Sequence, residues 1–282
     1  MNHMLEAFEA DVSDPRGVIV TGGSSGIGLA TARLYAARGF HVGLVARTED
    51  KLEKAADEVR SSRSESETIV SAHVADLCDA EATHRAIQGV LDDGIAPDIV
   101  VNSAGVIVPG EFVAMSPEDF ASNIDSGFWS VVHPCRVLAP MMIERGSGHI
   151  VNVSSVAGFL GVYGYTSYAA AKYAVMGFTE ALRFEMKPHG VAVSVVCPPD
   201  TNTPALERER QLRPPETDEI AGTIKPVQSE RVAEAILAGV DRGKYYIIPG
   251  LESRMLFRLK GLLPEVFFRI VDKDVRKVRS GR

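Results

Sequence analysis

Short apolar runs alternate with amphipathic segments along most of the chain. Seven runs rich in β-branched residues predict strands, at 17–21, 41–46, 68–74, 98–102, 149–155, 191–197 and 245–249. Most of these runs are apolar at nearly every position, which is typical of parallel strands covered on both faces. The stretches between them, such as 26–38, 49–60 and 79–92, are long enough for helical crossovers. The pattern predicts an α/β fold: a single Rossmann-type, doubly wound parallel sheet of about seven strands with helices on both faces.

Two regions interrupt this alternation. Residues 198–226 are rich in proline and charge, and they predict a substrate lid over the crevice of the sheet. Residues 251–282 form a basic tail in which Pro264 separates two short amphipathic helices. The chain therefore divides into an N-terminal extension at 1–15, an α/β domain at 16–250 that carries the lid, and the tail.

Composition narrows the partners and the compartment. The 282 residues are 45% hydrophobic and 24% charged with a net charge of −7, so nothing favours nucleic acid as a partner. The three cysteines are far apart and predict neither disulfides nor a metal site, as in a reducing cytoplasm. The acidic start lacks the apolar core of a signal peptide, and no apolar run is long enough for a transmembrane helix. We expect a cytoplasmic protein without bound metal.

A glycine-rich loop follows the first predicted strand and opens the first helix. Glycine is needed where φ is positive or where backbone approaches a phosphate closely. The following helix then presents its free N–H groups and positive dipole end to a pyrophosphate. A plain tight turn is the alternative, but the strand before the loop and the helix after it favour a dinucleotide. The residues assigned to it are Gly22, Ser24, Ser25, Gly26, Ile27 and Gly28.

The end of the second strand predicts which dinucleotide binds. An acid is expected there to accept from a ribose 2′-hydroxyl, but Arg47 stands in its place and Lys51 follows one turn later. Arginine favours a 2′-phosphate, so the loop predicts NADP(H). The alternative is that Arg47 is merely solvated. Asp76 and Leu77, after the third strand, are expected near the adenine, and Asn102 near the crevice at the end of the fourth strand.

Tyr168 and Lys172 lie four residues apart, which places them on one helix face. A nearby ammonium favours tyrosinate and lowers the pKa of a phenol. Tyr168 could then exchange a proton with a carbonyl or an alcohol. Ser155 follows the fifth strand and could hold the same oxygen, with its neighbour Ser154 as the second choice. Tyr-x-x-x-Lys alone is common on helix surfaces.

The glycine loop, "NSAG", Ser155 and the pair of Tyr168 and Lys172 occur together in this chain. On these motifs the chain resembles the short-chain dehydrogenase/reductase family over about 16–249. The resemblance implies hydride transfer from a nicotinamide with Tyr168 as proton donor. It also implies that Lys172 binds the nicotinamide ribose and that Ser155 polarises the substrate carbonyl.

The run "PPDTNT" stands where that family has P-G-x-x-x-T, which implies that Pro198 and Thr203 lie at the nicotinamide carboxamide, with Pro199 replacing the glycine. One departure concerns the asparagine that completes a proton relay in the family, because its position falls on Gly127. Asn123, one turn earlier, is the alternative. Gly127 either leaves room for water or marks reduced activity.

Within the family, "LVARTEDKLEKA", "HPCRVL" and "VVCPPDTNTPAL" resemble 3-ketodihydrosphingosine reductases. This implies NADPH-dependent reduction of a long-chain lipid-like ketone in sphingolipid synthesis. Two alternatives stay open: a reductase of another β-keto substrate such as a 3-oxoacyl thioester, and a non-catalytic NADP-binding sensor. The lid is acidic, which suits an ammonium better than an acyl carrier, although such a run also suits a solvated face. Its acids are Glu207, Glu209, Glu216, Asp218 and Glu219.

The tail bears on the lipid. Residues 252–282 contain nine basic and four acidic residues, a net charge of +5, interleaved with apolar side chains. Such helices bind peripherally to an anionic membrane interface; the alternative is packing over the cleft or a partner subunit. By analogy with the family, we expect a homodimer or homotetramer formed through 111–145 and 166–187.

Overall fold

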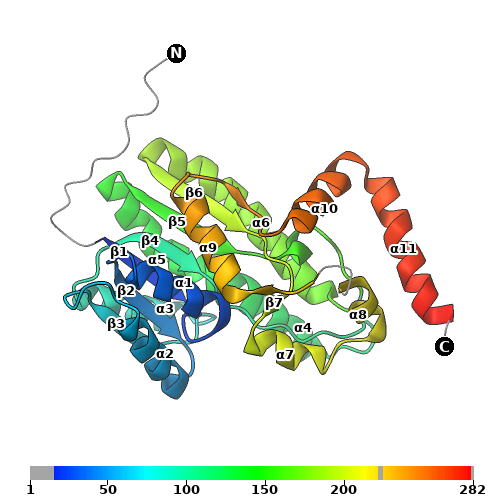
Figure 1. The fold of residues 1–282 in the computed structure, drawn as a ribbon, viewed down its shortest axis with the longest axis horizontal. Helices are drawn as coiled ribbons and strands as arrows, with labels where there is room; N and C mark the ends of the chain where they lie inside the picture. Colours follow the sequence, from blue (N-terminus) through cyan, green and yellow to red (C-terminus); the bar gives the residue numbers. More distant parts are fainter. Residues whose placement is uncertain (1–15, 222–224, 281–282) are drawn as a thin grey trace, which may run out of the picture.

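One parallel sheet of seven strands runs through the middle of the molecule (Figure 1). The computed structural model describes residues 16–221 and 225–280, so the predicted extension at 1–15 lies outside the described residues. The strands are β1 (Gly17–Thr21), β2 (His41–Ala46), β3 (Val70–Val74), β4 (Pro97–Asn102), β5 (Gly148–Val153), β6 (Val191–Val196) and β9 (Tyr246–Ile247). Their order is β3-β2-β1-β4-β5-β6-β9, and every neighbouring pair is parallel. The predicted doubly wound sheet is confirmed.

Helices cover both faces because the strands are apolar on both sides. On one face lie α1 (Gly26–Ala36), α2 (Glu49–Ser61) and α9 (Ser229–Val240); on the other lie α3 (Ala80–Asp92), α5 (Ser130–Arg145) and α6 (Thr166–Met186). In β1, Val18 and Val20 pack against the first group and Ile19 against the second, all without solvent exposure. Successive side chains of a strand point to opposite faces of the sheet, and each face is covered by a hydrophobic core. This explains the nearly continuous apolar runs.

Chain order reverses at β1, which fixes where a ligand can bind. From β1 the chain runs outward through β2 and β3, then returns to the other side for β4, β5, β6 and β9. The last residues of the two central strands, Thr21 and Asn102, are paired in register. In sheets of this kind the crevice lies outside the carboxyl ends of the strands at that switch point.

The helical stretch before β5 has three parts. These are α4 (Pro117–Ile124), a π-helical turn η1 (Asp125–Trp129) and α5. Ser116 caps α4, accepting a hydrogen bond from the backbone N–H of Asp119 at 3.0 Å. The apolar pattern did not predict the π turn, because a five-residue change of pitch leaves no distinct periodicity.

The predicted lid contains regular structure. Strand β7 (Thr201–Asn202) pairs with β8 (Val227–Gln228), and α7 (Pro204–Arg210) and α8 (Pro215–Ala221) lie between them. Thr203 caps α7, since its hydroxyl accepts from the N–H of Leu206 at 3.2 Å, and Pro204 takes the first helical position. Leu206 is buried and anchors α7.

The tail forms the two predicted helices, α10 (Leu251–Leu262) and α11 (Pro264–Ser280), which project at the far end of the molecule (Figure 1). Phe267 of α11 is buried, and Phe257 of α10 packs edge-on against Phe159 with ring centroids 5.0 Å apart. The ammonium of Lys277 on α11 pairs with Glu219 of α8 at 2.7 Å, so tail and lid are in contact.

Two short 3-10 turns, η2 (Val156–Gly158) and η3 (Lys187–His189), flank α6. Cys78, Cys135 and Cys197 are free thiols. Within residues 16–221 and 225–280, no helix is long and apolar enough to cross a bilayer.

Candidate active site

A cavity of about 600 Å³ opens at the carboxyl ends of β1, β4 and β5, and residues between Pro198 and Glu209 of the predicted lid line one side of it. The structure brings nearly all of the predicted site residues to its walls. These are Gly22, Ser24, Ser25, Gly26, Ile27, Arg47, Lys51, Asp76, Leu77, Ser154, Ser155, Tyr168, Lys172, Pro198 and Thr203. Gly28 and Asn102 do not line it.

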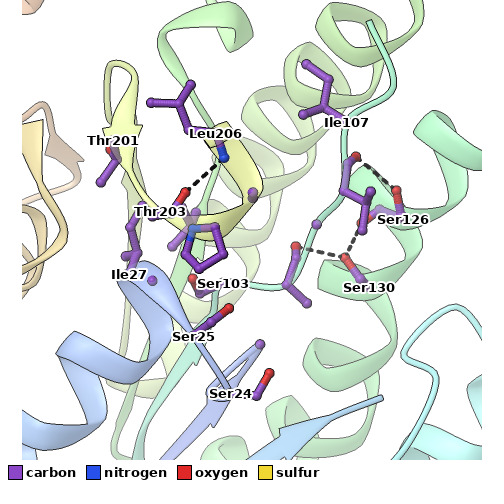
Figure 2. A pocket seen from close by; sticks show the side chains of 18 of the residues that line it. Ser24, Ser25, Ile27, Ser103, Ile107, Ser126, Ser130, Thr201, Thr203 and Leu206 are labelled. Atoms are coloured by element: carbon purple, nitrogen blue, oxygen red, sulfur yellow. Dashed lines mark hydrogen bonds between the residues drawn. The ribbon is translucent and has the colours of Figure 1, made fainter. Parts of the chain in front are cut away.

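The glycine loop forms the floor of this cavity (Figure 2). Gly22 and Gly26 have φ values of +67° and +55°, which favour glycine. A side chain at Gly28 would place its Cβ 2.3 Å from the carbonyl oxygen of Gly22, so this glycine lets α1 approach the loop. Ser25 stands at the N-cap of α1 but makes no capping hydrogen bond with its side chain. The first N–H groups of α1 and the hydroxyls of Ser24 and Ser25 therefore suit a phosphate.

Cations gather at the outer end of the cavity. Arg47, Lys51 and Lys54 line it and are exposed, accompanied by Glu58. The sequence analysis missed Lys54, although it lies three residues after Lys51 and therefore on the same side of α2. Asp76 follows β3 and accepts a hydrogen bond from the N–H of Cys78 at 3.0 Å. The excess of positive charge suits a 2′-phosphate better than a ribose hydroxyl.

Asn102 ends β4 as predicted, but its side chain does not line the cavity. Its side chain is fully buried, where it donates to Oδ1 of Asn152 at 2.9 Å and lies 3.3 Å from Sγ of Cys135. The hydroxyl of Thr21 donates to Asn102 Oδ1 at 3.4 Å. The side chain ties β1, β4 and β5 together inside the sheet, and residues 103–106 line the cavity instead.

Ser155, Tyr168 and Lys172 meet at one wall of the cavity. The ammonium of Lys172 lies 5.8 Å from the ring centre of Tyr168 and donates to the carbonyl of Val153 at 3.1 Å. Ser155 caps η2 by accepting from a backbone N–H, which leaves its O–H to donate elsewhere. The hydroxyl of Ser154 donates to the backbone carbonyl of Lys172 at 2.9 Å. Ser155 is therefore better placed to donate to a substrate oxygen.

The electrostatics of this wall differ from the prediction. Burial raises the pKa of Tyr168 above its ordinary value, the carboxylate of Glu209 adds to this, and the hydrogen bond with Ser155 acts in the opposite direction. Burial lowers the pKa of Lys172 to about 8. The predicted lowering of the pKa of Tyr168 is wrong for this structure, because burial and the charge of Glu209 give a net rise.

Gly127 is explained by packing. It lies in η1 against α6, where a Cβ would come within 2.8 Å of the Cβ of Ala171. Asn123 does not replace the missing asparagine. Its amide exchanges two hydrogen bonds of 2.8 Å with the backbone of Val108 and donates a third to Ser167, so it secures a loop instead of reaching Lys172.

The lid supplies the opposite wall. Thr203 stands over the glycine loop, beside Leu206 and above Ser25 and Ile27 (Figure 2), and its hydroxyl caps α7. Glu209 also lines this wall, buried to 8% exposure. The sequence analysis noted its charge but gave it no position in the site.

Known proteins are similar to this chain in sequence and in fold. A family profile of short chain dehydrogenases matches residues 16–213, so the chain belongs to that family. Among curated proteins, a cattle (Bos taurus) protein named 3-ketodihydrosphingosine reductase is 36% identical over 255 residues, covering 88% of this chain and 75% of its own. A protein of the same name from Dictyostelium discoideum is 31% identical over 269 residues, covering 90% of this chain and 80% of its own.

Solved structures agree with this assignment. A short-chain dehydrogenase from Sphingobium yanoikuyae in complex with NADPH is 29% identical with a TM-score of 0.73, over 89% of this chain and 95% of that one. A family member from Burkholderia phymatum in complex with NAD has a TM-score of 0.79 at 24% identity, over 90% of this chain and 95% of that one, and shows the shared fold.

Proposed function

We propose that this chain is an NADPH-dependent reductase that converts the ketone of a long-chain 3-ketosphingoid base, 3-ketodihydrosphingosine, to a secondary alcohol. The observation that carries the proposal is the convergence of Ser155, Tyr168 and Lys172 on the cavity that also holds the glycine loop and Arg47. The names of the curated relatives supply the substrate class.

The cavity fits a phosphorylated dinucleotide. The uncapped start of α1 and the hydroxyls of Ser24 and Ser25 would hold the pyrophosphate. Arg47, Lys51 and Lys54 would neutralise the 2′-phosphate. Asp76, Leu77, Pro198 and Thr203 line the cavity; the first two would contact the adenine and the last two the nicotinamide.

Tyr168, Ser155 and Lys172 would have different roles in the reduction of the ketone. NADPH, when bound, would supply the hydride for the carbonyl carbon. Tyr168 donates its hydroxyl proton to the carbonyl oxygen, and its raised pKa keeps that proton in place until the oxygen becomes basic. Ser155 donates a hydrogen bond to the same oxygen and stabilises the charge that develops on it. Lys172 would bind the nicotinamide ribose and stabilise the tyrosinate once the proton has left.

The test measures NADPH oxidation by absorbance with 3-ketodihydrosphingosine in detergent micelles, with NADH run in parallel. Tyr168→Phe removes the proton donor and is expected to lower kcat by about 100-fold or more while leaving NADPH affinity unchanged. A 3-oxoacyl thioester serves as the competing substrate.

Turnover of the sphingoid ketone by the wild type, lost in Tyr168→Phe, supports the proposal. Turnover of the thioester alone would leave the site in place but assign the enzyme to another β-keto substrate. NADPH binding without turnover of either ketone would favour a non-catalytic sensor.

We also propose that the corner between α10 and α11 contacts an anionic membrane peripherally from the cytoplasmic side, close to an insoluble substrate. The tail helices turn some apolar side chains inward and others outward. Phe267 is 5% exposed, whereas Leu262 and Phe268 are 78% and 48% exposed. Arg258 and Arg269 are exposed on the same helices. Apolar side chains flanked by bases suit an interface with acidic headgroups.

Co-sedimentation with vesicles tests this membrane contact. Leu262→Asp combined with Phe268→Asp should abolish binding to vesicles that contain phosphatidylserine, whereas Leu251→Asp, exposed at the other end of α10, should not. Equal binding to neutral and acidic vesicles, or binding that survives the double change, would remove the tail from this role.

The assembly is proposed to be a homodimer or homotetramer formed through 111–145 and 166–187. Met141 on α5 and Phe184 on α6 support it, because they are 41% and 62% exposed. Light scattering of Phe184→Glu should show a smaller particle than the wild type.

A further inference from the structure

A cluster of charged side chains joins the lid to the inner wall of the cavity. The guanidinium of Arg213 is 2% exposed and donates to Oδ2 of Asp200 at 2.8 Å and to Oε1 of Glu209 at 2.7 Å. The hydroxyl of Tyr165 donates to the same Oε1. The ring of Tyr165 packs edge-on against Tyr168 with centroids 5.8 Å apart, so the cluster adjoins the proton donor.

The buried charges of this cluster do not balance. Two carboxylates, those of Asp200 at 23% side-chain exposure and Glu209 at 10%, face one guanidinium. Asp218 lies 3.8 Å from that guanidinium but is 59% exposed, so solvent screens its charge. Arg208 also lines the cavity, but it is exposed and its charge is screened by solvent. An excess of buried negative charge is costly unless a cation completes it.

One carboxylate oxygen of Glu209, Oε2, is available to accept a hydrogen bond from a ligand. Its side chain is 10% exposed, and its hydrogen bonds and ion pair with Tyr165 and Arg213 all fall on Oε1. Within residues 16–221 and 225–280, Oε2 has no hydrogen-bond partner. Glu209 and Tyr168 line the same cavity, and Tyr165 contacts both of them, so this carboxylate faces the space in which the carbonyl would react.

We infer that Glu209 binds a primary ammonium on the carbon next to the reacting ketone, so that the site selects α-amino ketones over plain β-keto substrates. This inference rests on the proposed function and names what its site recognises. Tyr165 and Arg213 hold the carboxylate in position, and Asp200 holds the guanidinium. A ketone without the amine cannot form this charge-assisted hydrogen bond with Oε2, which disfavours a 3-oxoacyl thioester relative to the amino ketone.

The substrate itself provides the first test. Wild-type enzyme is given 3-ketodihydrosphingosine and its deamino analogue, in which hydrogen replaces the amine, in identical micelles. A charge-assisted hydrogen bond predicts about 10–100-fold higher kcat/KM for the amino ketone. This arm needs no variant, so it does not depend on how the lid tolerates substitution.

The second arm uses a matched pair of lid variants. Glu209→Gln keeps the shape but removes the charge, and it should lower kcat/KM for the amino ketone about 10-fold or more while the deamino analogue changes little. Glu207→Gln removes an exposed charge from the same helix and should change neither substrate. NADPH affinity, measured by fluorescence, should be the same in all three proteins.

The outcomes separate this inference from the proposed function. Equal kcat/KM for both ketones in the wild type would overturn the role of Glu209 while leaving ketone reduction in place. An equal loss on both substrates in Glu209→Gln would assign Glu209 a structural role and also overturn it. Failure to reduce either ketone, with activity on a thioester, would overturn the proposed function itself.

Discussion

Replacing Lys172 with methionine should make the folded protein more stable at neutral pH while it abolishes catalysis. Lys172 is 4% exposed, and its described hydrogen bond is a single one, to the carbonyl of Val153. Burial lowers the pKa of its ammonium from the ordinary value of 10.5 to about 8. Below pH 8 the folded protein therefore carries a buried charge that the unfolded chain keeps in water.

The pKa shift gives the size and the sign of the effect. A lowering of this extent corresponds to about 3 kcal/mol for a single group. Between pH 8 and 10.5 the unfolded chain binds more protons at Lys172 than the folded one, so the free energy of unfolding rises with pH in this window. Integrated from pH 7 to pH 9.5, the contribution of Lys172 grows by about 2 kcal/mol. Cysteines and tyrosines whose pKa values burial raises in the folded protein titrate in this window once the chain is unfolded, so the wild type alone would not isolate the contribution of Lys172.

The assay is urea unfolding of both proteins, without cofactor, at pH 7, 8, 9 and 9.5. The advantage of Lys172→Met should be largest at pH 7 and shrink by about 2 kcal/mol at pH 9.5, because the other titrations cancel in the difference. A difference that stays constant with pH would refute the reasoning, since it would mean that the ammonium of Lys172 keeps its ordinary pKa when the protein folds.

Three further changes test other parts of the molecule. Arg47→Asp should raise the KM for NADPH about 100-fold and that for NADH far less, measured by steady-state kinetics, and an equal change for both would place Arg47 outside the 2′-phosphate site. Gly127→Ala should lower the unfolding free energy by about 1–3 kcal/mol because its Cβ meets α6, whereas Gly177→Ala, which meets nothing within 4 Å, should be neutral or stabilising. Phe267→Ala should speed hydrogen exchange of α11, and Phe268→Ala, 48% exposed, should not; matching rates would show that α11 is not anchored there.

The sheet and the glycine loop could be predicted because each depends on short-range patterns. Strands that are covered on both faces have to be apolar on both, and Gly22 and Gly26 have to adopt positive φ. The spacing of Tyr168 and Lys172 was sufficient to place both on one wall, since a helix fixes that geometry locally.

Properties that depend on burial were beyond the sequence. Asn102 ends a strand at the crevice, but only the packing of β4 against β1 and β5 turns its amide inward to Asn152. Likewise, proximity of Lys172 to Tyr168 predicts a lowered phenol pKa, whereas burial and the charge of Glu209 raise it. Gly127 looked like a lost functional residue, and the contact with α6 gives it a steric reason.

The two ends of the cavity carry side chains of opposite charge. Exposed cations, Arg47 and Lys51 among them, lie at the outer end, whereas buried carboxylates, including Glu209, lie at the inner end beside Tyr168. A dinucleotide phosphate and a substrate ammonium are therefore attracted to opposite ends, and each is repelled from the place of the other. The inner carboxylates belong to the segment before α8, and α8 is paired to the tail through Lys277 and Glu219. The proposed ammonium site and the tail therefore belong to one connected unit outside the sheet. The sheet sets up hydride transfer, and we expect the choice of ketone to reside in that unit.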